Sequence, residues 1–149
     1  MVLIRSLLFN IVYYLATTVM VVGSLPLFVF DPEGGGQRTV RGWSRVGLFL
    51  LRVIVGTRLV VRGLDTLPSG GVIIASKHQS MFETFALYNV LERPTFVMKS
   101  ELSRVPLWGW YARRVGMIAV ERDEGTRALR KLAVDVEESL KSGKQIIIF

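Results

Sequence analysis

The sequence of 149 residues contains no cysteine and a single histidine. Without cysteine the chain cannot build a disulfide scaffold, a thiolate nucleophile, or a cysteine-ligated zinc or iron–sulfur site. One histidine likewise excludes a metal site built from several imidazoles. Negative charge is also scarce, because 12 acidic residues stand against 19 basic ones and give a formal net charge of +7. This excess indicates an anionic partner, either nucleic acid or a phospholipid surface.

Charged residues are absent between Arg5 and Asp31, where the chain is almost continuously apolar. A helix over residues 7–30 would be about 36 Å long, enough to cross a hydrocarbon core of roughly 30 Å with some tilt. Scattered polar residues leave a re-entrant or surface-lying helix open. A secretory signal peptide is disfavoured, because the apolar run is too long and no good cleavage site follows it. A buried helical hairpin in a soluble protein is the remaining alternative.

Two further elements complete the amino-terminal segment of residues 1–56. Residues 31–37 (Asp-Pro-Glu-Gly-Gly-Gly-Gln) are rich in turn formers and predict a flexible linker, without the Gly-Lys-Ser/Thr of a phosphate-binding loop. Residues 43–56 predict a second helix of about 21 Å, too short to span, with Arg45 and Arg52 on one face as in an interfacial helix. Most basic residues follow the long apolar run, so if that run spans a membrane, the positive-inside bias predicts that the remainder of the chain is cytoplasmic.

Beyond residue 57, short apolar runs alternate with helical patterns. The runs show no period-two alternation, which is typical of strands buried on both faces. We therefore predict an α/β fold, with a mostly parallel sheet covered by helices on both faces and preceded by the membrane-associated helical segment. The expected strands are residues 72–75, 95–98, 117–120 and 145–149, and the expected helices are residues 81–91, 107–114 and an amphipathic helix whose apolar stripe is Ala128, Leu129, Leu132, Ala133, Val136 and Leu140.

The sequence stops at Phe149, inside the last expected strand. Strands of open α/β sheets normally lead into loops, and the loops beyond their carboxyl ends hold the ligand site. We therefore expect residues 57–149 to be the amino-terminal part of an α/β domain that is incomplete at its carboxyl end.

The residues that carry chemistry gather where the first expected strand meets a helix, in Lys77-His78-Gln79-Ser80-Met81-Phe82-Glu83-Thr84. Such strand-to-helix junctions are where α/β sheets bind ligands. A carboxylate that accepts one imidazole N–H leaves the other ring nitrogen to act as a general base on a hydroxyl group. His78 and Glu83 are therefore candidate catalytic residues. Glu83 has a structural alternative, because Ser80-x-x-Glu83 is a helix-capping box.

The same stretch resembles the first signature block, His-x4-Asp, of the glycerophospholipid acyltransferases, and among them the bacterial 1-acyl-glycerol-3-phosphate acyltransferases. Lys99-Ser100-Glu101-Leu102 resembles that family's Lys-x-Glu-Leu stretch. Residues 116–122 (Gly-Met-Ile-Ala-Val-Glu-Arg) resemble its second block, Gly-x-Ile-Phe-Ile-Asp-Arg. Three motifs in the family's order, within residues 72–149, make the resemblance specific.

The resemblance implies that the chain is an acyltransferase. His78 would deprotonate the free hydroxyl of 1-acyl-glycerol-3-phosphate (lysophosphatidic acid), with its imidazole oriented by Glu83. The resulting oxygen would attack an acyl thioester of coenzyme A or acyl carrier protein and give phosphatidic acid. Arg122 and Lys99 would hold the substrate phosphate, the arginine through a bidentate fork and the lysine as a point charge. No metal, no cofactor and no nucleic acid is implied. The expected location is the bacterial inner membrane, with the catalytic domain on its cytoplasmic side.

The chain departs from the family pattern in three respects. Glu83 and Glu121 stand where aspartate is more frequent, and the third block, Phe-Pro-Glu-Gly-Thr-Arg, is missing after residues 146–149. The same letters Glu-Gly-Thr-Arg at residues 124–127 open the amphipathic helix, and we assign them no substrate role. Because half of the phosphate site is then absent, we expect residues 1–149 alone to have little or no activity.

Two other functions stay open on the sequence. One is a non-enzymatic basic module that docks on anionic membranes, which the net charge supports. The other keeps the fold and changes the acceptor to another lysophospholipid or a lipid-A-type sugar. No residue before Phe149 determines the acceptor, the acyl donor or the preferred acyl-chain length.

Overall fold

The chain forms two compact units in the computed structural model, which describes residues 2–31, 34–121 and 125–149. One unit comprises Met1–Leu64 with Ser80–Val90, and the other comprises Asp65–Gln79 with Leu91–Phe149. The first unit is helical and contains α1 (Val2–Gly23), α2 (Leu25–Phe30), α3 (Gly35–Leu50), the π-helix η1 (Leu51–Val55) and α4 (Phe82–Val90). The second contains the 3₁₀ helices η2 (Leu64–Thr66, from the unit boundary) and η3 (Ser100–Arg104), the helices α5 (Trp108–Val115) and α6 (Thr126–Lys141), and the strands β1 (Val72–Ala75), β2 (Pro94–Lys99), β3 (Ile118–Val120) and β4 (Gln145–Ile148).

The long apolar run forms two helices, not the single helix predicted over residues 7–30. The first, α1, begins at Val2, and the helix is interrupted at Ser24 before α2 begins. Pro26 lies in the first turn of α2, where its missing N–H is tolerated but would interrupt a continuous helix. Within the described ranges, α1 is the one helix long and apolar enough to cross a membrane. Only 6% of the most apolar 18-residue stretch of α1 is buried.

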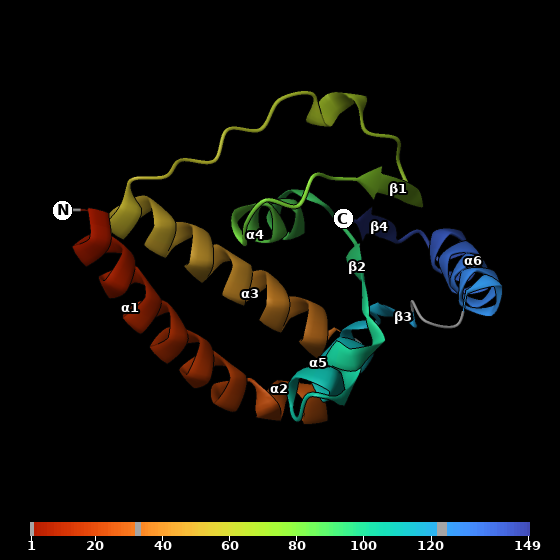
Figure 1. Ribbon diagram of the computed structural model, residues 1–149, viewed down its shortest axis with the longest axis horizontal. Helices are drawn as coiled ribbons and strands as arrows, with labels where there is room; N and C mark the ends of the chain where they lie inside the picture. Colours follow the sequence, from red (N-terminus) through yellow and green to blue (C-terminus); the bar gives the residue numbers. More distant parts are fainter. Residues whose placement is uncertain (1, 32–33, 122–124) are drawn as a thin grey trace. The chain divides into compact units, whose positions relative to one another are not determined.

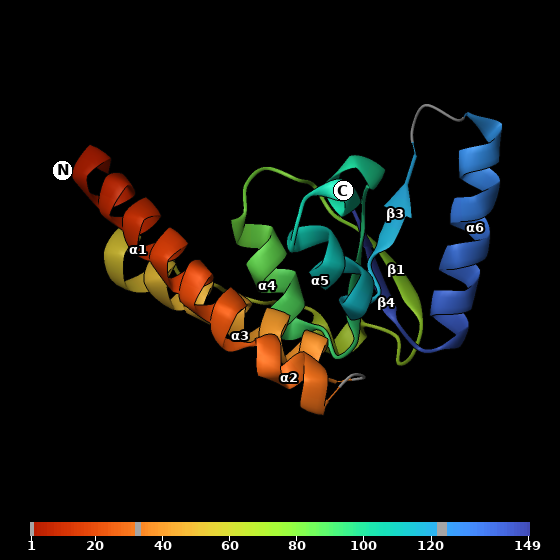
Figure 2. The same ribbon diagram turned by 90° about the horizontal axis from the view of Figure 1, so that it is seen from below.

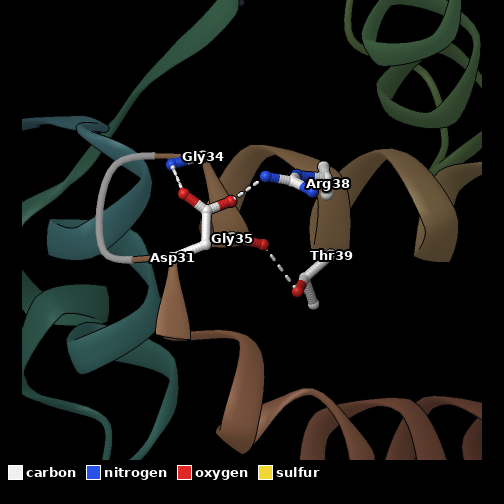
Figure 3. Close-up of polar contacts among 5 residues, drawn as sticks. All are labelled: Asp31, Gly34, Gly35, Arg38 and Thr39. Atoms are coloured by element: carbon white, nitrogen blue, oxygen red, sulfur yellow. Dashed lines mark hydrogen bonds and ion pairs between the residues drawn. The ribbon is translucent and has the colours of Figure 1, made fainter. Parts of the chain in front are cut away.

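The predicted linker over residues 31–37 is wrong at its carboxyl end, because Gly35 already begins α3, and its residues 32 and 33 lie outside the described ranges. The Asp31 carboxylate accepts a hydrogen bond from the Gly34 N–H at 2.9 Å and forms an ion pair with Arg38 (Figure 3). The backbone of α3 approaches α2 so closely that a Cβ atom on Gly35 would lie 2.5 Å from the Leu27 carbonyl oxygen. The glycines therefore permit close packing at a helical corner.

The second predicted helix, residues 43–56, is confirmed in type but begins eight residues early. It continues from α3 through η1 and ends at Gly56, whose φ of 89° suits a residue without a side chain. Arg45 and Arg52, the two predicted surface arginines, are both exposed. In Figure 1, α3 runs beside α1, and the two make direct contact.

Helix α4 joins this helical pair through an aromatic core. Phe85 is 1% exposed, and its ring centroid lies 4.8 Å from that of Trp43 on α3 and 5.8 Å from that of Tyr13 on α1. A Cβ atom on Gly47 would lie 2.9 Å from the Phe85 ring. The three helices thus share one core, although α4 follows α3 only after an intervening strand.

Hydrogen bonds fix the register of α4 on α3. The buried Ser44 hydroxyl donates to the Phe85 carbonyl oxygen at 2.5 Å and accepts from the Asn89 amide at 2.7 Å. The Tyr88 hydroxyl donates to the Gln37 side-chain oxygen at 2.7 Å. Burial raises the pKa of the Tyr88 phenol well above its usual range, against the opposing effect of Arg41, so the phenol stays a neutral donor.

The second unit is built on a four-stranded sheet in the order β1-β4-β2-β3, in which every described pairing is parallel. The expected strands are confirmed, β1 with its predicted bounds and the others within two residues. Helix α6 lies on one side of the strands and α5 on the other, as Figure 2 shows. The predicted α/β class is therefore correct. The central strand β4 carries Ile146 and Ile147, both fully buried.

The apolar stripe predicted on α6 is narrower in the structure. Ala128 is buried, but Leu129 is 65% exposed and Ala133 is also exposed. These two residues lie four positions apart, about 100° and 140° around the helix from Ala128. Only one side of α6 therefore contacts the sheet, through β3 and β4.

We predict that Gly35→Ala lowers the free energy of unfolding by about 1–3 kcal/mol, because the new methyl group would overlap the Leu27 carbonyl oxygen. Denaturant titration in detergent micelles measures this effect. Gly23→Ala is the matched control, since a Cβ atom there meets nothing within 4 Å. Equal effects of the two substitutions would show that the corner is not closely packed.

Candidate active site

The carboxyl ends of the parallel strands define one edge of the sheet. The register pairs Ala75 with Ile148 and Lys99 with Val120, so these strands end at the same edge. In open α/β sheets, ligands bind in the loops beyond this edge. Two of the predicted site residues in this unit, His78 and Lys99, lie there.

His78 follows β1 by three residues and is exposed. Its imidazole stacks on the Phe149 ring, with 4.4 Å between centroids and 27° between planes. Phe149 in turn stacks on Phe96, with 5.6 Å between centroids. Stacking occupies the face of the imidazole, and the two nitrogen atoms lie at its edge. The ring is therefore held by the residue that follows β4, the strand beside β1, and is open to solvent. No local sequence pattern indicates this contact.

Glu83 lies in the first turn of α4 and is half-buried. Its carboxylate accepts hydrogen bonds from the Ser80 N–H at 2.7 Å and from the Ser80 hydroxyl at 3.0 Å. The Ser80 hydroxyl also accepts from the Phe82 N–H at 3.1 Å. These bonds form the capping box that the sequence offered as the structural alternative, so Glu83 has a structural role whatever its part in catalysis.

His78 and Glu83 belong to different units, joined at the Gln79–Ser80 peptide. The pairing of the two side chains therefore stays a prediction that rests on their spacing along the chain. A carboxylate has four lone-pair positions, so it can accept from Ser80 and from a further donor at the same time. Capping and orientation of an imidazole are therefore chemically compatible in one glutamate.

The two predicted phosphate-binding residues have different outcomes. Lys99 is the last residue of β2 and is exposed at the carboxyl edge. Arg122 lies outside the described residues, and its role stays a prediction.

Next to it in the sequence, Glu121 forms an ion pair with Arg104 at 4.0 Å. Both partners are largely exposed, so this pair contributes little to stability. Arg104 is a basic residue at this edge that motif analysis missed, because it falls outside the three blocks.

Among the described residues, no three acidic, histidine or cysteine side chains lie together as a metal-binding group. The predicted independence from metals and cofactors stays a prediction.

The three sequence motifs thus occur in a chain with a parallel α/β sheet and a histidine-bearing loop at the carboxyl edge of that sheet. The chain belongs to the Acyltransferase family, which matches residues 58–149. The resemblance inferred from the motifs is therefore confirmed.

Two relatives and one solved structure illustrate the relationship. The 1-acyl-sn-glycerol-3-phosphate acyltransferase of Pseudomonas aeruginosa is 38% identical over 149 residues, which cover 98% of this chain and 57% of that protein. Lysophosphatidylcholine acyltransferase 1 of Rattus norvegicus is 29% identical over 131 residues, 79% of this chain and 24% of that protein. The crystal structure of the 1-acyl-sn-glycerophosphate (LPA) acyltransferase PlsC from Thermotoga maritima has a TM-score of 0.73 and 23% identity, and the match covers 99% of this chain and 61% of that one. The fold is thus shared, and the chain spans 57% of the length of its Pseudomonas relative.

We predict that Ser80→Ala destabilises the protein by about 1 kcal/mol, because it removes both hydroxyl hydrogen bonds of the capping box. Thermal or denaturant unfolding measures the change. Glu83→Gln is the control, since glutamine also accepts a hydrogen bond at this capping position. A Glu83→Gln variant destabilised as much as Ser80→Ala would show that charge, rather than hydrogen bonding, makes the cap.

Proposed function

We propose that the protein transfers a fatty acyl group from a thioester to the free hydroxyl of 1-acyl-glycerol-3-phosphate, with His78 as the general base. The observation that carries this proposal is an exposed imidazole at the carboxyl edge of a parallel sheet, in a chain of the Acyltransferase family. The name of the Pseudomonas relative supports the choice of acceptor.

The reaction needs one proton to move twice. The His78 imidazole takes the proton from the acceptor hydroxyl as its oxygen attacks the thioester carbonyl carbon. A tetrahedral intermediate forms and collapses, breaking the carbon–sulfur bond. The departing thiolate of coenzyme A or acyl carrier protein takes the proton back, so an ester and a thiol leave a neutral imidazole. Glu83 would orient the ring and stabilise its charged form during this sequence.

The phosphate of the acceptor would be held by Lys99 and Arg122. Lys99 ends β2, the second strand from β1 in the sheet, and its exposed ammonium group suits a dianionic headgroup. Arg122 follows β3 by two positions in the sequence, which supports a role at the same edge.

We also propose that the protein works at the bacterial inner membrane, with its α/β unit on the cytoplasmic side. The apolar helix α1 supports the membrane association. The basic residues that follow α1, against Arg5 alone near the start of that helix, support the orientation.

A second candidate keeps the reaction and changes the acceptor. The rat relative is named for lysophosphatidylcholine, which supports acceptors with other headgroups in this family. Competition between lysophosphatidic acid and lysophosphatidylcholine, expressed as a ratio of kcat/KM values, distinguishes the two candidates.

His78→Ala in the full-length protein should lower the rate of acyl transfer by about 10²–10⁴-fold, because the substitution removes the proton acceptor. Radiolabelled acyl-CoA and lysophosphatidic acid in membranes provide the assay. Arg130→Ala, at an exposed position on α6, is the control for expression and folding. Activity within about tenfold of the unmodified protein would rule out His78 as the base.

The comparison with Glu83→Gln separates capping from catalysis. Glutamine keeps the cap but removes the negative charge that would stabilise an imidazolium ion. A variant with normal stability and strongly reduced kcat supports an orienting role for Glu83. An unchanged kcat would show that Glu83 caps the helix and does not orient the imidazole.

Lys99→Ala should raise the KM for lysophosphatidic acid by roughly 10–100-fold with little change in kcat, because one charged contact of about 1.5–3 kcal/mol is lost in both ground and transition states. Steady-state kinetics with a monoacylglycerol, which has no phosphate, provide the control. An equal effect on both acceptors would contradict phosphate binding by Lys99.

A further inference from the structure

Four large apolar side chains are exposed within seven residues of the second unit. Leu102, Val105, Leu107 and Trp108 are 43%, 47%, 59% and 41% exposed, and we call them the apolar turn. They lie where η3 passes into α5. Single exposed apolar residues are common on protein surfaces, but a concentrated group marks an interaction site.

The backbone at the centre of the apolar turn is strained. Leu107 has a φ of 63° and a ψ of −53°, and it is the one described non-glycine residue with positive φ. The Trp108 N–H donates to the Pro106 carbonyl oxygen at 2.7 Å, which makes this a γ-turn of the rare, strained form. Strain of this kind persists where the surrounding structure imposes it, and it is concentrated at functional sites. Burial does not explain it, because Leu107 is the most exposed of the four side chains.

Close packing and hydrogen bonds surround the strained residue. Gly109 packs on η3 so closely that a Cβ atom would lie 1.8 Å from the Ser103 carbonyl oxygen. The same carbonyl accepts a hydrogen bond from the Arg113 guanidinium at 3.1 Å. The Gly109 N–H donates to the Val105 carbonyl oxygen at 2.8 Å. The apolar turn is therefore preorganised.

Charge around the apolar turn identifies its partner. Residues 99–114 carry four basic side chains, Lys99, Arg104, Arg113 and Arg114, and one acidic side chain, Glu101. Exposed apolar groups, a tryptophan and surrounding arginines are together typical of a segment that lies in the interface of an anionic membrane. An acidic protein such as acyl carrier protein would use the basic charge but would leave four apolar side chains without a purpose.

We propose that the apolar turn inserts into the interfacial region of an anionic phospholipid bilayer. Because η3 follows β2 directly, this contact would bring the sheet edge that carries His78 and Lys99 to the lipid surface. The contact goes beyond acyl transfer and beyond the membrane association of α1, and it can be tested without turnover.

The absence of cysteine allows a direct measurement of depth. Leu107→Cys and Val105→Cys are each labelled with an environment-sensitive fluorophore in the full chain, reconstituted with vesicles of phosphatidylglycerol and phosphatidylcholine that contain a headgroup-labelled quencher lipid. Val134→Cys on α6, at a position 61% exposed, is the matched control because α6 lies on the opposite side of the sheet from α5 (Figure 2). Val105 provides a label site whose backbone lies in the ordinary extended region.

Quenching at residues 105 and 107 should exceed that at residue 134 by at least about twofold, and it should weaken in vesicles of phosphatidylcholine alone. Equal quenching at all three sites, or none at residues 105 and 107, would overturn the proposal. So would fluorescence at residue 107 that responds to acyl carrier protein and not to vesicles, which would identify an acidic protein as the partner.

Discussion

Contact between Phe85 and the helices α1 and α3 is the interaction on which the helical unit depends. The Phe85 ring fills the space between Tyr13 and Trp43 and lies against Gly47, where any side chain would displace it. The Ser44 hydroxyl, which donates to Phe85 and accepts from Asn89, then fixes the position of α4 along α3. Because Glu83 lies in the first turn of the same helix, the packing that builds the apolar amino-terminal unit also orients the turn that carries a candidate catalytic carboxylate.

The chain passes from one unit to the other at the peptide between Gln79 and Ser80, with His78 before it and Glu83 after it. The capping box follows this passage directly and fixes the helix start through Ser80. A glutamate in place of the more frequent aspartate suits such a double role, because its longer side chain can reach back to the Ser80 backbone. Glu83 can therefore cap α4 and still orient an imidazole.

Local signals in the sequence predicted the strands and α4 well. An uninterrupted apolar run gave β1 its correct bounds, and the capping box located the start of α4 to within one residue. The prediction of a flexible linker that includes Gly35 was wrong. Gly35 permits a close tertiary contact with Leu27, which turn propensity does not encode. Stacking of His78 on Phe149 depends on the order of the strands, which no local pattern encodes. The roles of His78, Glu83, Lys99 and Arg122 rest on family motifs and general chemistry.

The order of the strands also constrains how the α/β unit can assemble. Strand β1 pairs with β4 alone among the described strands, and β4 separates it from β2. As the chain emerges from the ribosome, β2 and β3 can therefore pair early, whereas β1 must wait until more than sixty further residues have been made. Pairing between strands so far apart in the sequence slows folding. Until β4 is made, the edges of β1 and β2 that will pair with it stay exposed. Early anchoring of α1 in a bilayer would shelter the apolar surface of that helix during this delay.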